Sequence, residues 1–251
     1  MKRGILMKYA LDVHTHTLVS GHAYSTLMEN AKAASEKGIK VLGTTEHGVT
    51  MPNSPHIWYF HNYKVLPREM YGVTMLYGVE ANISDYEGNL DMDDYTINKV
   101  DIVIGSIHPQ PGVYTVGTKE ENTNAFINAI KSGKIDIIGH IGNPQVPIDF
   151  EKVVKCAFEN NVLVEINNSS FTTSRIGSKE NCREVALLCK EYGVKLVINS
   201  DAHFCTKIGE FTSAIELLKE IDFPDELIIN SKPEELLMKL KKKGKLGDLE
   251  I

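Results

Sequence analysis

The sequence has few cysteines, no long apolar run and no excess of positive charge, and each absence excludes a class of protein. Its 251 residues include only 4 Cys, none of them in a Cys-x-x-Cys pair: Cys156, Cys182, Cys189 and Cys205. This pattern favours free thiols in a reducing compartment over disulfides or thiolate-bound zinc. We therefore expect a cytoplasmic protein.

The chain also lacks the long apolar segments that membrane and secreted proteins carry. No apolar run approaches the roughly 20 residues that a membrane-spanning helix needs. Lys2 and Arg3 stand near the start of the chain, but the apolar stretch from Ile5 is broken at Lys8. That stretch is too short for a signal peptide. We expect no membrane partner.

Positive charge is also scarce, with 27 Lys and Arg against 33 Asp and Glu and a net charge of -6. Proteins that bind nucleic acid usually carry a basic face. The one dense basic run, residues 239–245, is typical of a solvated last helical turn, where cations complement the helix dipole. This excess of acidic over basic residues argues against a nucleic-acid partner. An acidic enzyme can still bind a small phosphorylated substrate if metal ions supply positive charge locally.

Linkers, repeats and low-complexity stretches are absent as well, so we predict one domain over residues 1–251. Hydrophobic residues make up 42% of the chain, which is enough for one large core. α/β barrels of roughly 250 residues are common as single domains.

Short apolar runs alternate with helical patterns along the chain. Helices are expected over residues 25–37 with Ser25 as N-cap, 151–160 after Asp149, 179–192 after Ser178, 209–220, and from Ser231 with Glu234 completing a capping box. Residues 52–70, rich in aromatics and proline, should form a long loop with one helical turn. Seven strands are expected, over residues 9–13, 41–45, 74–79, 101–106, 135–139, 162–166 and 194–200.

Several of the expected strands are apolar on both faces, which indicates a parallel sheet covered by helices. The best fit is a distorted, closed or nearly closed (β/α)7 TIM-like barrel. A doubly wound open sheet is the alternative.

Metal-binding residue types fall at the ends of these strands. The carboxyl ends of parallel barrel strands open onto one face, where such barrels place active sites, and a His-x-His in an extended segment points both rings the same way. Imidazole with carboxylate suits zinc, iron or manganese. His56 and His61 lie in the aromatic loop and are assigned no metal. The predicted ligands are His14, His16, His22, His47, Glu80, His108, His140, Asp201 and His203.

The residues around these ligands resemble the PHP (polymerase and histidinol phosphatase) superfamily, and most closely its stand-alone bacterial phosphatases. Two departures stand out: Glu46 replaces a frequent Asp, and Ile141 follows His140 where a Pro is frequent. Neither removes a ligand, and Glu46 affects only the support of His47. The resemblance rests on Asp12-Val-His14-Thr-His16, Glu46-His47-Gly48, Gly78-Val-Glu80, His108, Gly139-His140 and Ser200-Asp201-Ala-His203.

The resemblance implies a (β/α)7 barrel with a metal centre at the carboxyl ends of its strands, usually of three zinc ions, with manganese or iron as alternatives. It implies three ligand groups, with Glu80 bridging the first two ions. These groups are His14, His16, Glu80 and Asp201; Glu80, His108 and His140; and His22, His47 and His203.

The chemistry of phosphate esters favours such a centre. Monoester hydrolysis needs up to ~10²¹-fold acceleration, whereas one general acid or base supplies about 10²–10⁴. We therefore predict a metal-dependent phosphatase acting on a small phosphate monoester. A metal-bridging hydroxide would attack phosphorus in line, with Glu80 and Asp201 as the catalytic carboxylates.

Fixed donors for the phosphate are expected beside the metals. Arg175 offers a bidentate guanidinium just before a helix start with free N–H groups. Asn167 and Asn168 end the sixth strand on the same face. The plainer alternatives are a surface ion pair for Arg175 and a turn closed by the two Asn residues.

Other functions remain open from sequence alone. A phosphodiesterase or nuclease of the same fold is the nearest rival. An amidohydrolase also uses His-x-His and a late Asp, but Glu80, His22, His203 and seven strands argue against it. A non-catalytic, metal-stabilised domain would be expected to lack some ligands. Assembly as a homo-oligomer is also open.

Overall fold

The computed structural model describes residues 9–172, 174–247 and 249. The expectation that the segment from Lys2 to Lys8 is no signal peptide concerns residues outside this part of the chain.

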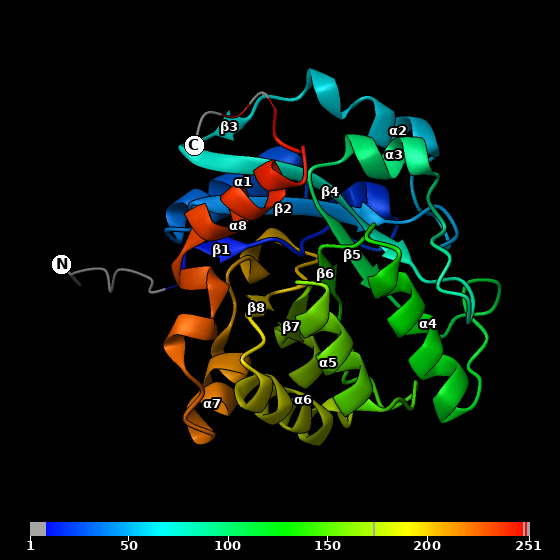
Figure 1. Cartoon of the computed structure of the whole chain (residues 1–251). Coiled ribbons are helices and arrows are strands. Elements are labelled where there is room, and N and C mark those ends of the chain that lie inside the picture. Colours follow the sequence, from blue (N-terminus) through cyan, green and yellow to red (C-terminus); the bar gives the residue numbers. More distant parts are fainter. Residues whose placement is uncertain (1–8, 173, 248, 250–251) are drawn as a thin grey trace.

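Seven parallel strands form one sheet in the order β1-β2-β4-β5-β6-β7-β8 (Figure 1). This confirms the predicted barrel-like arrangement of seven strands. A short strand, β3 (Glu69–Met70), pairs antiparallel with the start of β4. The parallel strands are β1 (Leu11–Asp12), β2 (Val41–His47), β4 (Val73–Asn82), β5 (Val103–Ser106), β6 (Ile137–Ile138), β7 (Leu163–Asn167) and β8 (Leu196–Asn199).

Helices separate most of the parallel strands, as a right-handed β-α-β succession requires. They are α1 (Leu27–Glu36), α2 (Ile57–His61), α3 (Asp94–Lys99), α4 (Lys119–Lys131), α5 (Phe150–Glu159), α6 (Ser178–Tyr192), α7 (Thr212–Glu220) and α8 (Pro233–Lys242). Short 3-10 turns lie between them: η1 (Leu18–Ser20), η2 (Tyr63–Val65), η3 (Asn168–Phe171), η4 (Cys205–Lys207), η5 (Asp225–Leu227) and η6 (Ile229–Ser231).

The predicted starts of α1 and α8 are wrong. The α1 helix is capped by Thr26 in a capping box with Glu29, because the Ser25 hydroxyl instead accepts a hydrogen bond from the Cys205 backbone N–H. The α8 helix begins at Pro233 without a side-chain cap. There the hydroxyl of Ser231 donates to the Ile228 carbonyl rather than forming a box.

The predicted starts of α5, α6 and α7 agree with the structure to different degrees. Asp149 caps α5 as expected, whereas Ser178 is the first residue of α6 and Gly177 its cap. The α7 helix starts at Thr212 rather than near residue 209. Sequence reasoning missed α3 and α4, although the capping box of Thr118 and Glu121 at the start of α4 is a usable signal. The aromatic loop holds α2, η2 and β3.

The hydrophobic core has two layers, one on each side of the strands. The outer layer packs the strands against α1 to α7, including Phe60 of α2. The inner layer fills the barrel with strand residues such as Leu76, Ile104 and Ile137, and Leu236, Leu237 and Leu240 of α8 pack onto them. In Figure 1, α8 crosses the end of the sheet where the strands begin. The opposite end, where the strands finish, is left for polar side chains.

Side chains and isolated backbone contacts, rather than a continuous strand ladder, join the two ends of the sheet, β1 and β8. Asn230 is fully buried. Its Nδ2 donates to the carbonyls of Leu11 at 2.7 Å and Ile198 at 2.6 Å, and its Oδ1 accepts from the Ile198 N–H at 2.7 Å. Nearby, Asn199 Oδ1 accepts from the Val13 N–H at 2.9 Å. The barrel is thus closed by asparagine amides together with a backbone bond from the His16 N–H to the Ala202 carbonyl at 2.9 Å.

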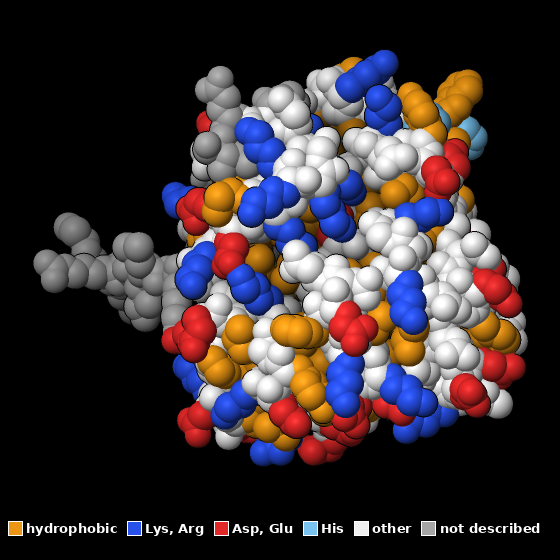
Figure 2. All heavy atoms as spheres, viewed as in Figure 1, with side chains coloured by type: hydrophobic (Ala, Val, Ile, Leu, Met, Phe, Trp, Pro, Cys, Tyr) orange, Lys and Arg blue, Asp and Glu red, His pale blue; other side chains and the backbone are white. Residues whose placement is uncertain are grey.

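The surface seen in Figure 2 carries acidic and basic side chains interspersed over the same face, with little histidine. Within the described residues, no helix is long and apolar enough to cross a membrane.

Replacing Asn230 by Ala should lower the free energy of unfolding by about 2–3 kcal/mol, because it leaves buried backbone groups of β1 and β8 without partners. Urea unfolding followed by circular dichroism measures this. The exposed Asn124 of α4 supplies the control, since its change to Ala should stay within about 0.5 kcal/mol. Equal effects in the two variants would show that Asn230 does not close the barrel.

Candidate metal centre

The nine predicted ligands meet at the carboxyl end of the barrel. His14 and His16 follow β1, His47 is the last residue of β2, and Glu80 lies beside it because the two strands pair in that register. All but His22, His108 and His203 are buried. His108 and His140 follow β5 and β6, His22 lies in the loop after η1, and Asp201 and His203 follow β8.

The carboxylate of Glu80 stands at the centre of this group. Its Oε2 lies 2.8 Å from His47 Nδ1, 3.3 Å from His14 Nε2 and 3.5 Å from His16 Nε2. Its Oε1 lies 2.9 Å from His140 Nε2 and 3.3 Å from His108 Nε2. Each oxygen therefore faces a different set of rings.

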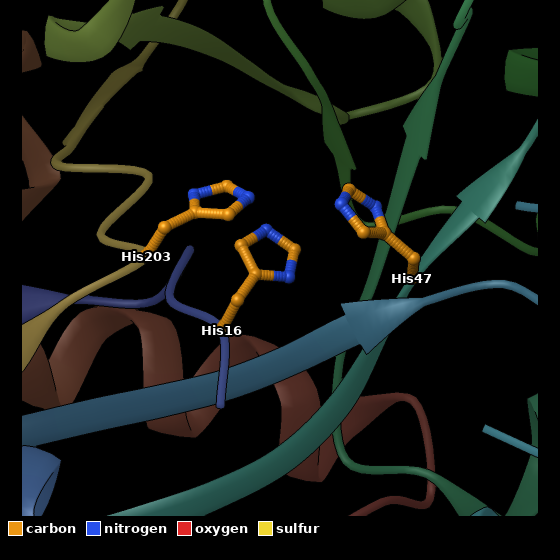
Figure 3. A group of neighbouring side chains, drawn as sticks. All are labelled: His16, His47 and His203. Carbon is orange, nitrogen blue, oxygen red and sulfur yellow. The ribbon is translucent and has the colours of Figure 1, made fainter. Parts of the chain in front are cut away.

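A second group consists of imidazoles alone. His16, His47 and His203 reach from three separate segments toward a common space (Figure 3). His22 completes the group, with its Nε2 3.2 Å from His47 Nε2 and 3.0 Å from His203 Nε2. Neutral imidazoles at these distances can pair as N–H donor and acceptor. With their protons on the outer nitrogens, the same rings would instead turn lone pairs toward a shared cation.

Several of these atoms are buried and make no well-directed hydrogen bond, although His47 Nδ1 and Glu80 Oε2 lie only 2.8 Å apart. They include His14 Nε2, His16 Nε2, His47 Nδ1 and Glu80 Oε2. Buried polar atoms are nearly always satisfied, and each exception needs an explanation. Here the exceptions are adjacent acceptors of nitrogen and oxygen type. Such a donor set fits divalent metal ions.

The electrostatics of the site also favour positive charge. Burial alone would raise the pKa of Glu80, but His14, His108 and His47 bring it well below its usual value. Burial lowers the pKa of His14, yet Glu165, Glu80 and Asp201 raise it well above the usual range. The negative charge of these carboxylates is therefore compensated by a cation, either a proton on His14 or a metal ion.

In the group made of imidazoles alone, the pKa values shift in the direction opposite to that of His14. Burial, followed by His47 and His203, lowers the pKa of His22 to about 4. Burial and the same two neighbours bring the pKa of His16 well below its usual value. These rings are neutral near pH 7, which is the form that binds metal.

Polar side chains behind the ligands orient them. His14 Nδ1 lies 2.7 Å from Glu165 Oε1, and His108 Nδ1 lies 2.6 Å from Asn82 Oδ1. Sequence reasoning assigned these partners no role. Glu165 carried a signal, because a carboxylate inside the apolar strand β7 requires a buried polar partner.

Glu46 supports His47 indirectly. Its carboxylate accepts hydrogen bonds from the hydroxyls of Thr17 and Ser20, both at 2.6 Å. The Ser20 oxygen in turn accepts from the backbone N–H of His47 at 3.2 Å and lies 3.2 Å from His16 Nδ1. Glu46 therefore fixes the η1 turn against two ligands without touching the ring of either.

Three site residues that are not glycine adopt left-handed backbone conformations: His140 at φ 28°, Arg175 at φ 53° and Asp201 at φ 53°. Such conformations cost about 1–3 kcal/mol each and persist where the surroundings enforce them, often at functional sites.

Of the three predicted substrate contacts, Arg175 lies closest to the ligands. Its Nη2 donates to Asp201 Oδ2 at 2.6 Å and its Nε to Ser170 Oγ at 2.9 Å. Asn167 is buried and its amide donates to Glu165 and Asp201. Asn168 Oδ1 accepts from the Ala214 N–H at the start of α7.

A hollow of about 650 Å³ opens over the cluster, and both Arg175 and Asn168 line it. Its rim includes Tyr24 and Phe204, which are 78% and 48% exposed and therefore free to meet a ligand. Lys207 also lines the rim. Sequence reasoning did not single out these rim residues, because a loop position beside a ligand gives no pattern of its own.

A family model described as PHP domain matches residues 12–169. The chain belongs to this family. A protein from Clostridium novyi named probable phosphatase is 60% identical over 245 residues, covering 98% of this chain and all of that protein. One from Clostridium botulinum with the same name is 53% identical over the same span.

Among solved structures, histidinol phosphate phosphatase from Lactococcus lactis, complexed with zinc, L-histidinol and phosphate, superposes with a TM-score of 0.62. The match covers 86% of this chain and 95% of that protein at 16% identity. At that identity the likeness supports the barrel fold alone. The PHP chain described here therefore shares its fold with a zinc-containing phosphatase.

Proposed function

We propose that this chain is a metal-dependent phosphatase that hydrolyses a small phosphate monoester. The observation that carries the proposal is the position of Glu80, whose two oxygens face two separate sets of imidazoles. That arrangement suits a carboxylate shared by two cations. Family membership and the names of the relatives support the same activity.

The first of three metal positions would be held by His14, His16, Glu80 and Asp201. In a tetrahedral zinc site with bonds of about 2.1 Å, neighbouring donor atoms lie about 3.4 Å apart. The two His Nε2 atoms lie 3.3 and 3.5 Å from Glu80 Oε2. They lie 3.6 and 3.3 Å from Asp201 Oδ1. These four distances are compatible with one four-coordinate ion.

The other two positions have looser support. Glu80 Oε1, His108 and His140 would hold the second ion, while His22, His47 and His203 would hold the third. The side-chain groupings that can share an ion overlap these sets without matching them. One places His16 beside His47 and His203, and another places His47 beside Glu80 and His108. Zinc is the preferred ion because imidazole dominates the donor set, and manganese or iron suits the same donors.

Ions held together in this way polarise phosphate oxygens and lower the pKa of bound water. Asp201 contributes in its ionised form. Burial raises its pKa, but His14, His16 and Arg175 bring it well below the usual value. At neutral pH it can therefore hold a cation or accept a proton, but it has no proton to donate.

Arg175 would bind the substrate's phosphate. A guanidinium carries five N–H donors, and two of its nitrogens already bond Asp201 and Ser170. This anchoring holds the group at the edge of the hollow while leaving donors for an anion. Asn168 would add an amide from the same wall, whereas the contacts of Asn167 favour a supporting position behind Asp201. A hollow of about 650 Å³ has room for a small molecule.

A panel of phosphate monoesters and diesters tests the activity. Purified protein should hydrolyse aryl and sugar monophosphates, lose this activity after chelation, and regain it with Zn²⁺ or Mn²⁺. Bis-aryl diesters should react far more slowly. Preferential cleavage of diesters would favour the phosphodiesterase alternative, and full activity in metal-free protein would contradict the mechanism.

Replacing Arg175 by Ala should lower kcat/KM for a monoester by about 10- to 100-fold, which corresponds to losing one or two charged hydrogen bonds. Metal content should stay unchanged, as elemental analysis checks. Arg183 of α6 does not line the hollow, so its change to Ala serves as the control. Unaltered kinetics in the Arg175 variant would leave that residue only its ion pair with Asp201.

A further inference from the structure

We propose that Glu165 is a positioning residue that sets the tautomer of His14 and ties this ligand to the backbone of His140. The inference rests on the metal centre of the proposed function. It assigns a role to a carboxylate that is not itself a ligand in that proposal.

Glu165 is buried in β7 and both of its oxygens are fully occupied. Oε1 lies 2.7 Å from His14 Nδ1 and accepts from Asn199 Nδ2 at 2.9 Å. Oε2 accepts from the His140 backbone N–H at 2.8 Å and from Asn167 Nδ2 at 3.2 Å. Three N–H donors and His14 Nδ1 converge on one carboxylate, which serves the three N–H groups as an acceptor.

An acceptor at Oε1 determines where His14 carries its proton. Nδ1 must hold a hydrogen to donate to Glu165, so a neutral His14 has its lone pair on Nε2. That atom faces Glu80 Oε2 and Asp201 Oδ1 at 3.3 and 3.6 Å. Glu165 thereby aims the metal-binding nitrogen of His14 at the carboxylates of the first metal position.

The second oxygen of Glu165, Oε2, positions another proposed ligand, His140. His140 has a left-handed backbone at φ 28°, a conformation that needs an external restraint. Its N–H is held by Glu165 and its ring reaches Glu80 Oε1 at 2.9 Å. One carboxylate therefore positions a ligand of the first ion and a ligand of the second.

Glutamine is the informative replacement because it keeps the shape of Glu165 but turns one oxygen into a donor. If the new NH2 faces His140, it meets two donors there, the backbone N–H and the Asn167 amide. If it faces His14, that ring must accept at Nδ1 and carry its hydrogen on Nε2, which blocks metal binding. Neither orientation preserves the native contacts.

The experiment compares Zn²⁺ affinity in wild type and Glu165→Gln by competition with a chelator. We expect the affinity of the tightest site to fall about 10- to 100-fold, as is usual when a partner of a ligand histidine is lost. Asp136→Asn is the matched control. Asp136 is equally buried but lies where the barrel strands begin, accepting from the Val103 N–H at 3.0 Å. Its variant should bind Zn²⁺ as the wild type does.

A second measurement needs no variant. Long-range ¹H–¹⁵N spectra of zinc-loaded wild type should show His14 protonated at Nδ1 and metal-bound through Nε2. The proposal is overturned by the opposite tautomer, by unchanged Zn²⁺ affinity in Glu165→Gln, or by an equal loss in both variants. Both measurements omit substrate, so a failure to hydrolyse monoesters would contradict the proposed function and leave the role of Glu165 standing.

Discussion

The structure depends most on one buried carboxylate, that of Glu80, surrounded by imidazole nitrogens. An isolated buried anion is costly and must be compensated by positive charge or by several donors. Neutral imidazoles that turn lone pairs toward it cannot provide this, and both Glu80 Oε2 and His14 Nε2 are left without a hydrogen bond. Divalent cations between these atoms would resolve the conflict, so the packing of the barrel mouth and its proposed metal chemistry depend on each other.

The rest of the molecule holds that arrangement in place. The apolar side chains of α8 fill the end where the strands begin, which leaves the polar side chains to the other end. Asn230 closes the barrel between β1 and β8, and so brings the ligands after β8 next to those after β1. Behind the ligands, Glu46 and Glu165 fix loops and rings without entering the hollow. Rigid support of this kind is what precise metal geometry requires.

Sequence reasoning predicted the strands and the convergence of the ligands well, because both follow from short-range pattern and barrel geometry. His47 and Glu80 meet since β2 and β4 pair in parallel register. Prediction from sequence failed where a polar side chain can bond either a local partner or a distant one. Ser25 bonds Cys205 across 180 residues instead of capping α1. Glu165 lies 2.7 Å from His14, a partner 151 residues away to which the sequence gives no pointer. Such contacts depend on tertiary distances that no local pattern contains.

The central claim is that Glu80 bridges two ions, and counting metal per chain in Glu80→Gln tests it most directly. Glutamine keeps the shape but loses the charge that offsets repulsion between two close dications. Elemental analysis should show at least two ions lost together, along with the hydrolytic activity. His22→Ala, which touches only the imidazole side of the cluster, should lose about one. Loss of one ion or none from Glu80→Gln, with activity retained, would contradict the account.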